Sequence, residues 1–282
     1  MESRKRMTRE QLYEDGISKL NQQEIAEAKL DAWYLFSHVT GLSRVDYMLH
    51  KSEPVTEEQE ENFEKMIAKR ESHYPLQYII GKQEFMGLEF AVNENVLIPR
   101  QDTEVLVEEV LKVSEGKKVL DMCTGSGCII ISLASLSRLS GASAVDISDG
   151  ALEVAKENSK RNQVEINFIK SNLFENVSDK YDIIVSNPPY IESRVVETLM
   201  PEVRLYEPML ALDGREDGLY FYRRIIYQAK EYLNPGGRIF FEIGYDQGYK
   251  VKELLTEAGF RDVSVIKDLA GLDRVVRGSL EE

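Results

Sequence analysis

The sequence predicts an α/β protein in which a doubly wound sheet of seven strands follows a small N-terminal helical domain. Residues 1–72 carry helical patterns throughout. Residues 102–282 alternate short apolar segments of strand length with apolar-faced helical segments, which is typical of a doubly wound sheet. Residues 78–96 alternate aromatic and polar side chains around Gly81 and Gly87, which predicts a β-hairpin, and we expect residues 73–101 to form a hairpin and hinge that link the two domains.

The helical domain shows clear helix starts. Thr8-x-x-Gln11 and Thr56-x-x-Gln59 each have the spacing of a capping box, in which the two side chains satisfy backbone donors at a helix start. The helix expected between Glu24 and Val39 carries a broad apolar face. That face is formed by Leu30, Trp33, Tyr34 and Phe36. We therefore expect a small helical bundle.

Seven segments predict the strands of the sheet, and apolar helical segments separate most of them. They are residues 118–122, 142–146, 167–170, 181–186, 238–243, 263–266 and 273–277. At 282 residues and 43% apolar composition, the chain can bury cores for two domains.

Composition and charge count against several classes of function. The formal net charge of −14 repels a phosphate backbone, which counts against a DNA substrate. No apolar stretch approaches the roughly 18 residues of a membrane span, and the basic start lacks the apolar region of a signal peptide. We therefore expect a cytoplasmic protein without a membrane partner. The two cysteines lack Cys-x-x-Cys spacing and the three histidines are scattered, so we assign no metal.

The tetrapeptide Asn187-Pro188-Pro189-Tyr190 directly follows the expected strand 181–186. Open α/β sheets bind ligands at this end of their strands. Each proline fixes φ at about −65° and removes an N–H, so the loop is stiff and its carbonyls lack local donors. These carbonyls and the Asn187 side chain can accept from an NH₂ group, while Tyr190 offers a flat face. The motif predicts a site for a planar amine, although by itself it also fits a loop that merely turns.

A glycine turn follows the expected strand 118–122. The turn comprises Cys123, Thr124, Gly125, Ser126 and Gly127, and its glycines allow close backbone approach to a ligand. A dinucleotide fingerprint needs a third glycine where this chain has Ile130, and a Walker loop needs a Gly-Lys-Ser/Thr that is missing. Asp146 ends the next strand, where a carboxylate can accept from ribose hydroxyls. These residues favour a nucleoside without a pyrophosphate.

Longer stretches resemble one known family, the release-factor glutamine N5-methyltransferases of the PrmC/HemK type. The similarity covers the chain densely from about Pro75 onward. It is carried by residues 75–87 and 96–104, by the glycine turn, Asp146 and Asn-Pro-Pro-Tyr in that order, and by Glu207-Pro208, Asp217-Gly218-Leu219-Tyr220, Glu242-Ile243-Gly244 with Gln247, and residues 271–276. The resemblance implies a Rossmann-like methyltransferase domain over residues 102–282 with an antiparallel final strand, and a substrate-recognition domain over residues 1–72.

The resemblance also implies chemistry and partners. S-adenosyl-L-methionine would donate a methyl group, leaving S-adenosyl-L-homocysteine. The acceptor would be the side-chain amide nitrogen of the glutamine in the Gly-Gly-Gln motif of peptide-chain release factors, a modification bearing on translation termination. Asn187 and the Pro188 carbonyl would hold that amide, with Pro189 and Tyr190 beside it.

The cofactor residues implied by the resemblance are residues 123–127, Asp146, Asn187, and Asn172-Leu173-Phe174 after the third strand. The family usually has Asp where this chain has Asn172, so the adenine contact loses a charge. Arg100 and Glu104 belong to a family-like Pro-Arg-x-x-Thr-Glu stretch and are expected either at the methionine end or as a structural pair.

Two alternatives stay open at this point. A DNA or RNA adenine N6-methyltransferase presents the same planar NH₂ to Asn-Pro-Pro-Tyr, but it needs a flipped base, and this acidic chain shows no basic-aromatic recognition segment. A scaffold that binds a release factor without turnover is the nonenzymatic alternative. The chain keeps both the glycine turn with Asp146 and the Asn-Pro-Pro-Tyr motif, which argues against a scaffold without activity.

Overall fold

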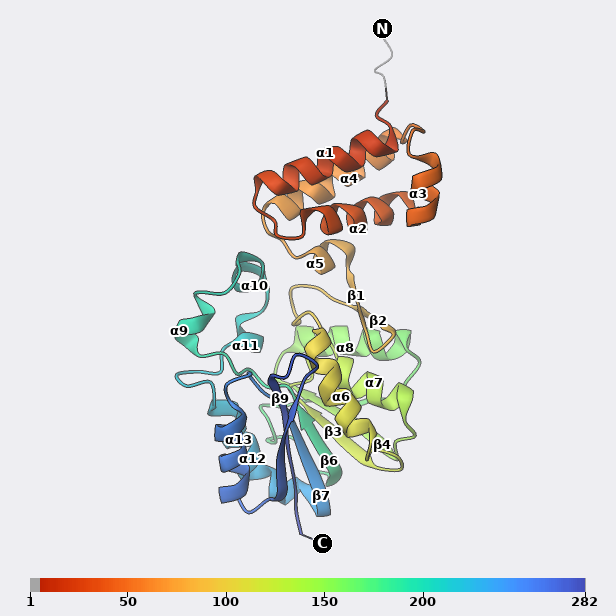
Figure 1. Ribbon diagram of the computed structural model, residues 1–282. Coiled ribbons are helices and arrows are strands. Elements are labelled where there is room, and N and C mark those ends of the chain that lie inside the picture. Colours follow the sequence, from red (N-terminus) through yellow and green to blue (C-terminus); the bar gives the residue numbers. More distant parts are fainter. Residues whose placement is uncertain (1–5, 282) are drawn as a thin grey trace. The chain divides into compact units, whose positions relative to one another are not determined.

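The computed structural model describes residues 6–281 and divides the chain into two compact units (Figure 1). The first unit comprises the described residues up to Gly81 together with Pro201–Tyr206. The second comprises Lys82–Met200 and Glu207–Glu282. The helical unit therefore extends beyond residue 72, where the sequence predicted its end, and it includes a short segment from much later in the chain.

The first unit is a helical bundle. Its helices are α1 (Arg9–Gln22), α2 (Ala28–Thr40), α3 (Arg44–His50), α4 (Glu57–Glu71), α5 (Leu76–Ile80) and α10 (Pro201–Tyr206). Both predicted capping boxes are present, at Thr8 and at Thr56. The aromatic rings of Trp33, Phe36 and Tyr47 meet at centroid distances of 5.4–5.9 Å, and all three are buried. Leu30 and Tyr34 of the predicted apolar face are exposed instead.

Arg70 explains why α10 belongs to this unit. Its buried guanidinium donates to Asp31 over 2.7 Å and to Glu202 over 2.6 Å. The Tyr206 hydroxyl also donates to the Ser72 carbonyl over 2.8 Å. Local sequence patterns cannot assign α10 to this unit, because the ion pair joins residues that are 132 positions apart.

The predicted hairpin is shorter than the pattern suggested. Strands β1 (Lys82–Phe85) and β2 (Leu88–Ala91) pair antiparallel in the second unit. Tyr78 instead lies in α5, which ends at Gly81 with a φ of 81°. Glycine adopts this left-handed conformation without steric cost, so it ends the helix and begins the hairpin.

The central sheet has the seven predicted strands. They are β3 (Lys118–Met122), β4 (Gly141–Asp146), β5 (Asn167–Lys170), β6 (Tyr181–Ser186), β7 (Leu233–Glu242), β8 (Arg261–Lys267) and β9 (Asp273–Ser279). Their order is β5-β4-β3-β6-β7-β9-β8. Strands β3 to β7 pair parallel, whereas β9 pairs antiparallel with β7 and β8. The final strand is therefore antiparallel, as expected.

Helices cover both faces of the sheet (Figure 1). On one face lie α6 (Glu104–Leu111), α7 (Cys128–Leu136) and α8 (Asp149–Arg161), and on the other α12 (Tyr220–Tyr232) and α13 (Gly248–Glu257). Successive residues of a strand point to opposite faces of the sheet and pack into different cores. Val119 packs in the core beneath α6 and α7, and Leu120 packs in the core beneath α12 and α13. Short helices η1 (Gln101–Thr103), α9 (Ser193–Val196) and α11 (Met209–Leu212) complete the unit.

The strand order reverses at β3: β4 and β5 lie on one side of it, and β6 and β7 lie on the other. Such a switch point opens a crevice beyond the carboxyl ends of the strands. The chain therefore brings the segments that follow β3, β4, β5 and β6 to one edge.

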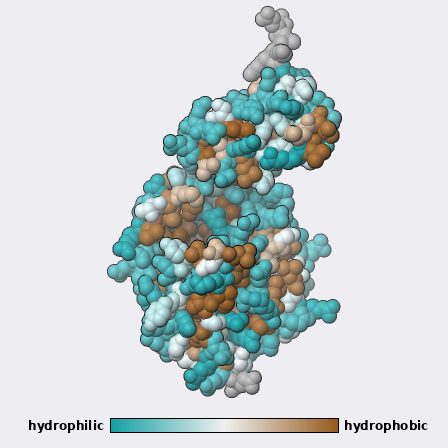
Figure 2. All heavy atoms as spheres, in the orientation of Figure 1, coloured by the Kyte–Doolittle hydropathy of each residue, from teal (hydrophilic) through white to brown (hydrophobic). Residues whose placement is uncertain are grey.

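Polar side chains cover much of the face shown in Figure 2, with apolar patches between them. Within residues 6–281, no helix is long and apolar enough to cross a membrane.

Candidate active site

A cavity of about 220 Å³ opens where the parallel strands end. Its walls come from the segments after four strands: Cys123 to Ser126 after β3, Asp146 to Ser148 after β4, Asn172 and Leu173 after β5, and Asn187 and Pro189 after β6. Arg100 and Thr103 line another side. The fold thus gathers most of the predicted site residues around one space.

The two glycines of the turn have different tasks. Gly125 has a φ of +55° and open space where a side chain would project. A side chain at Gly127 would instead meet Ile131 at 2.8 Å and Ala155 at 3.2 Å. Gly125 therefore leaves room for a ligand, whereas Gly127 lets α7 and α8 pack closely.

Asp146 fixes this turn from the end of β4. Its Oδ2 accepts from the Gly125 N–H and its Oδ1 from the Ser148 N–H, each over 2.9 Å. Burial raises the pKa of Asp146, while these backbone donors oppose the shift. Each carboxylate oxygen can accept a second hydrogen bond, so the residue can hold the turn and still receive hydroxyl donors from the cavity.

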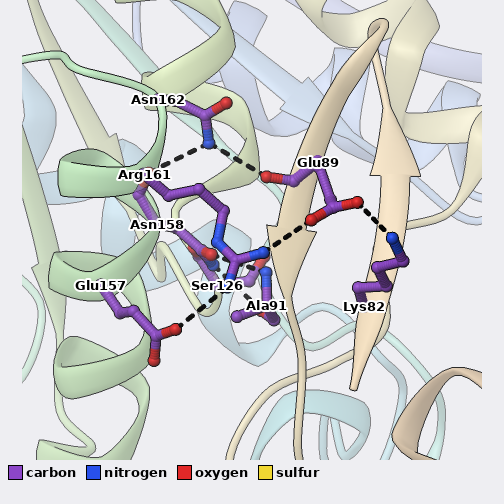
Figure 3. A network of polar contacts seen from close by, with 8 residues as sticks. All are labelled: Lys82, Glu89, Ala91, Ser126, Glu157, Asn158, Arg161 and Asn162. Carbon is purple, nitrogen blue, oxygen red and sulfur yellow. Dashed lines mark hydrogen bonds and ion pairs between the residues drawn. The ribbon is translucent and has the colours of Figure 1, made fainter. Parts of the chain in front are cut away.

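A polar network supports the same turn from α8 and the hairpin (Figure 3). Asn158 is fully buried, and its Nδ2 donates to the Ser126 carbonyl over 2.9 Å. The same amide exchanges two hydrogen bonds with the Ala91 backbone, over 2.7 and 3.0 Å. Asn162 extends the network by donating to the Glu89 carbonyl over 3.1 Å. One side chain therefore ties the glycine turn to β2.

Three nonglycine residues on the cavity wall adopt left-handed backbone conformations, and one of them is Arg215 with a φ of +72°. Cys123 has a φ of +63° and Leu173 a φ of +55°. Such conformations cost about 1–3 kcal/mol and concentrate at functional sites. Burial raises the pKa of Cys128 to about 12 and that of Cys123 further, so both thiols stay protonated at neutral pH. They are not activated nucleophiles.

The side-chain amide of Asn187 donates a long hydrogen bond of 3.5 Å to the Thr103 hydroxyl.

Tyr190 is fixed at two points. Its hydroxyl donates to Oε1 of Glu242 over 3.3 Å, and its carbonyl accepts from Gln247 over 3.0 Å. Burial raises the pKa of Tyr190 well above its usual range, so the hydroxyl remains a donor.

Comparison with known proteins identifies the family. A model of the PrmC N-terminal domain matches residues 11–81, and a model of the methyltransferase small domain matches residues 100–203. The release factor glutamine methyltransferase of Geobacter sulfurreducens is 42% identical over 263 residues, which cover 93% of each chain. That of Clostridium botulinum is 42% identical over 93% of this chain and 96% of its own. The chain belongs to the release factor glutamine methyltransferase family.

A solved methyltransferase from Pyrococcus furiosus has a similar fold. Its TM-score is 0.53 at 20% identity, and the match covers 70% of this chain and 90% of the other. The predicted Rossmann-like methyltransferase fold is thereby confirmed.

S-adenosylmethionine is the cofactor of this methyltransferase. The site fits that molecule. Beside Gly125 there is open space, and the remaining lone pairs of Asp146 can accept hydrogen bonds from hydroxyl groups such as those of a ribose. Leu173 and Ile147 supply an apolar wall of the kind that an adenine ring would need. The amide of Asn172 donates to Glu175 over 2.6 Å and accepts from Arg224 over 3.4 Å, so neighbours already fix its orientation.

Several predicted ligand residues lie outside the described cavity wall of this methyltransferase. Phe174 is buried and stacks on Tyr232 at a centroid distance of 4.6 Å. Glu104 accepts from the Met86 N–H over 2.7 Å, which makes it a support for the hairpin. Gly127, Pro188 and Tyr190 adjoin the wall without forming it among the described residues. Arg100 does line the cavity, and it pairs with buried Glu207 rather than with Glu104.

The sequence analysis gave no site role to four polar residues that line the cavity or support its wall. They are Thr103, Asp121, Asn158 and Gln247. Asp121 is fully buried beneath the glycine turn, accepts from Thr124 over 2.6 Å, and has its pKa raised to about 7 by burial. The position of Asp121 inside an apolar strand was an available signal, because a buried carboxylate is costly without a role. Thr103 and Asn158 carried no such signal.

Proposed function

We propose that this enzyme methylates the side-chain amide nitrogen of the glutamine in the Gly-Gly-Gln motif of cytoplasmic peptide-chain release factors. The family assignment supports the reaction class and substrate. The observation that carries the proposal is the orientation of Asn187, whose amide nitrogen is engaged by Thr103. Its oxygen is therefore free to accept a hydrogen bond from a substrate NH₂ group.

An amide nitrogen is a poor nucleophile because its lone pair is delocalised into the carbonyl. Asn187 Oδ1 and the Pro188 carbonyl would each accept one N–H of the substrate amide. Held in this way, the nitrogen becomes pyramidal and its lone pair is aimed into the cavity. The bound cofactor supplies an electrophilic methyl group on a sulfonium. The enzyme contributes orientation and charge placement, and effective molarity provides much of the acceleration.

Deprotonation needs no strong base on the enzyme. The nitrogen becomes acidic only as the new bond forms, so its proton can leave to water afterwards. Tyr190 does not serve as the base, because burial raises its pKa and its hydroxyl donates to Glu242. Tyr190, which adjoins the cavity wall, would flank the amide plane, and Pro189 lines the cavity beside it.

We also propose that the first unit recognises and binds the folded release factor. A single glutamine offers little surface, and the flanking glycines of its motif mainly allow close backbone approach. Additional contacts must therefore come from elsewhere on the substrate protein. The family model for residues 11–81 covers most of this unit, which indicates a module that accompanies the methyltransferase domain.

Labelled cofactor distinguishes this function from its alternatives. The enzyme is incubated separately with a release factor, with its Gly-Gly-Gln to Gly-Gly-Asn variant, and with duplex or single-stranded DNA. Label is expected only on the unaltered protein, and peptide mass spectrometry should place one methyl group on the glutamine. Label on adenine, or equal label on the asparagine variant, would contradict the substrate. Binding without any transfer would support a scaffold instead.

A further inference from the structure

Two charged side chains hold the amide of Asn172 at the end of the cavity that Leu173 also lines, here called the base end. The Nδ2 of Asn172 donates to Glu175 Oε1 over 2.6 Å, and its Oδ1 accepts from Arg224 Nη1 over 3.4 Å. Arg224 lines the cavity, whereas Glu175 is not among the described residues of the wall. The acceptor atom of the amide is therefore the one beside a residue of the cavity wall.

Arg224 projects from α12 and is itself held in place. Its Nη1 donates to the Tyr220 hydroxyl over 3.4 Å, and its guanidinium lies 5.6 Å from the centroid of the Tyr220 ring. Tyr220 lies one turn earlier on the same helix and also lines the cavity. A guanidinium that rests on an aromatic ring has less rotamer freedom left to lose. The donor to Asn172 is thus placed by α12 and needs no ligand to order it.

We propose that Arg224 and Glu175 determine which base the cofactor site accepts: together they fix the Asn172 amide with Oδ1 facing a bound base, so that the site takes a 6-aminopurine and rejects a 6-oxopurine. Arg224 and Glu175 are positioning residues, because they act through Asn172. The inference goes beyond the proposed function, since it concerns the base of the cofactor and no methyl acceptor.

Counting donors and acceptors gives the orientation of the amide. If Asn172 turned its amide over, Nδ2 would meet the guanidinium of Arg224, which can only donate. Its Oδ1 would meet the carboxylate of Glu175, which can only accept. Two repulsive contacts would replace two hydrogen bonds to charged groups, so the neighbours leave one orientation. The bond from Arg224 is long, and a carbonyl oxygen has two lone pairs, so Oδ1 can still accept from a ligand.

A fixed acceptor distinguishes two purines that have the same shape. The 6-amino group of adenine donates hydrogen bonds, whereas a 6-carbonyl group only accepts them. An amide free to turn over would serve both, because it carries a donor and an acceptor. The aspartate that the family usually has here accepts in either orientation. The asparagine of this chain therefore depends on Arg224 and Glu175 for a preference that a carboxylate has by itself.

Calorimetry with two ligands tests the proposal. S-adenosylhomocysteine carries the 6-amino group, and S-inosylhomocysteine carries a 6-carbonyl in its place. The wild type is expected to bind the adenosyl ligand about 10- to 100-fold more tightly. In the double variant Arg224→Met/Glu175→Gln, this ratio should fall to about threefold or less, and the inosyl ligand should bind more tightly than it binds to the wild type. A merely structural role of the two residues would weaken the binding of both ligands.

Arg223→Met is the matched control. Arg223 is the neighbour of Arg224 on α12, but it pairs with Asp217 and is not among the described residues of the cavity wall. Its replacement should leave the ratio unchanged within about twofold. In an Asn172→Asp background, the double variant should keep its preference for the adenosyl ligand, because a carboxylate needs no orienting neighbours.

Equal affinity of the wild type for the two ligands would overturn the proposal. So would an unchanged ratio in the double variant, or a loss of preference when Asn172→Asp is combined with it. No release factor enters these measurements, so their outcome does not depend on which protein the enzyme methylates.

Discussion

The Oδ2 atom of Asp146 lies 2.9 Å from the backbone nitrogen of Gly125, so one carboxylate at the end of β4 fixes the turn at the end of β3. Neighbouring parallel strands bring the two residues together, although 21 positions separate them. The same side chain lines the cavity. A substitution of Asp146 would therefore change both the cavity wall and the shape of the turn.

Asp146→Ala is expected to weaken S-adenosylmethionine binding about tenfold to hundredfold, because a hydrogen bond to a charged group contributes about 1.5–3 kcal/mol. Asp146→Asn should lose less, since its amide oxygen can still accept from Gly125. Isothermal titration calorimetry measures both. Unchanged affinity in Asp146→Ala would show that the ribose lies elsewhere.

Asn187→Ala is expected to lower the methylation rate sharply with cofactor affinity nearly intact. In the proposed reaction the Asn187 oxygen would hold the substrate amide as its geometry changes, so its loss should raise the free energy of the transition state. Single-turnover kinetics report the rate and calorimetry reports the cofactor Kd. Equal losses in the two quantities would place Asn187 in cofactor capture instead.

Asn158→Ala should weaken cofactor binding, although Asn158 does not line the cavity in the described structure. The substitution removes the donor to the Ser126 carbonyl and both bonds to Ala91, so the turn loses its lateral support. We expect a Kd increase of about three- to tenfold, as one or more buried hydrogen bonds are lost. Asn162→Ala is the control. Asn162 donates to Glu89 and not to the turn, and an equal Kd increase there would argue against a specific role of Asn158.

Two buried carboxyls predict a particular pH dependence of stability. Burial raises the pKa of Asp121 and of Glu242 to about 7, from ordinary values of 3.8 and 4.5. Between these limits the folded protein binds more protons than the unfolded chain, so these groups lower the free energy of unfolding as pH rises. Their favourable contribution is complete below about pH 4 and is lost as pH rises through about 7.

Urea unfolding of the wild type and of Glu242→Gln from pH 5 to pH 8 tests this expectation. The variant should gain stability relative to the wild type as pH rises, because it has no carboxyl to ionise. A stability difference that stays constant with pH would show that Glu242 ionises normally in the folded protein.

Arg70→Met should destabilise the first unit. The substitution leaves the buried Asp31 carboxylate without its partner and frees Glu202 of α10. Removal of one member of a buried pair costs about 3–5 kcal/mol. Trp33, the one tryptophan of the chain, lies in the same unit and reports its unfolding by fluorescence. Lys19→Met removes the exposed pair with Asp15 and should cost less than about 1 kcal/mol.

Sequence patterns by themselves determined the architecture and most of the motifs that line the cavity. Strand positions were predictable because alternating or continuous apolar residues report burial locally, and capping boxes at Thr8 and Thr56 report helix starts within three residues. The glycine turn, Asp146 and Asn187 were found because residues at the ends of parallel strands must meet at one edge of the sheet. The family resemblance added the cofactor and the substrate.

Tertiary structure decided which side chains support those motifs. Glu104 and Phe174 sit inside family-like stretches, yet one supports the hairpin and the other packs in the core. Thr103, Asn158 and Glu242 lie far along the chain from the residues they orient, and α10 joins the first unit through Arg70. Hydrogen bonds and ion pairs depend on distances of a few ångströms between remote segments. Local periodicity carries no information about such distances, so these contacts become visible only when the chain has folded.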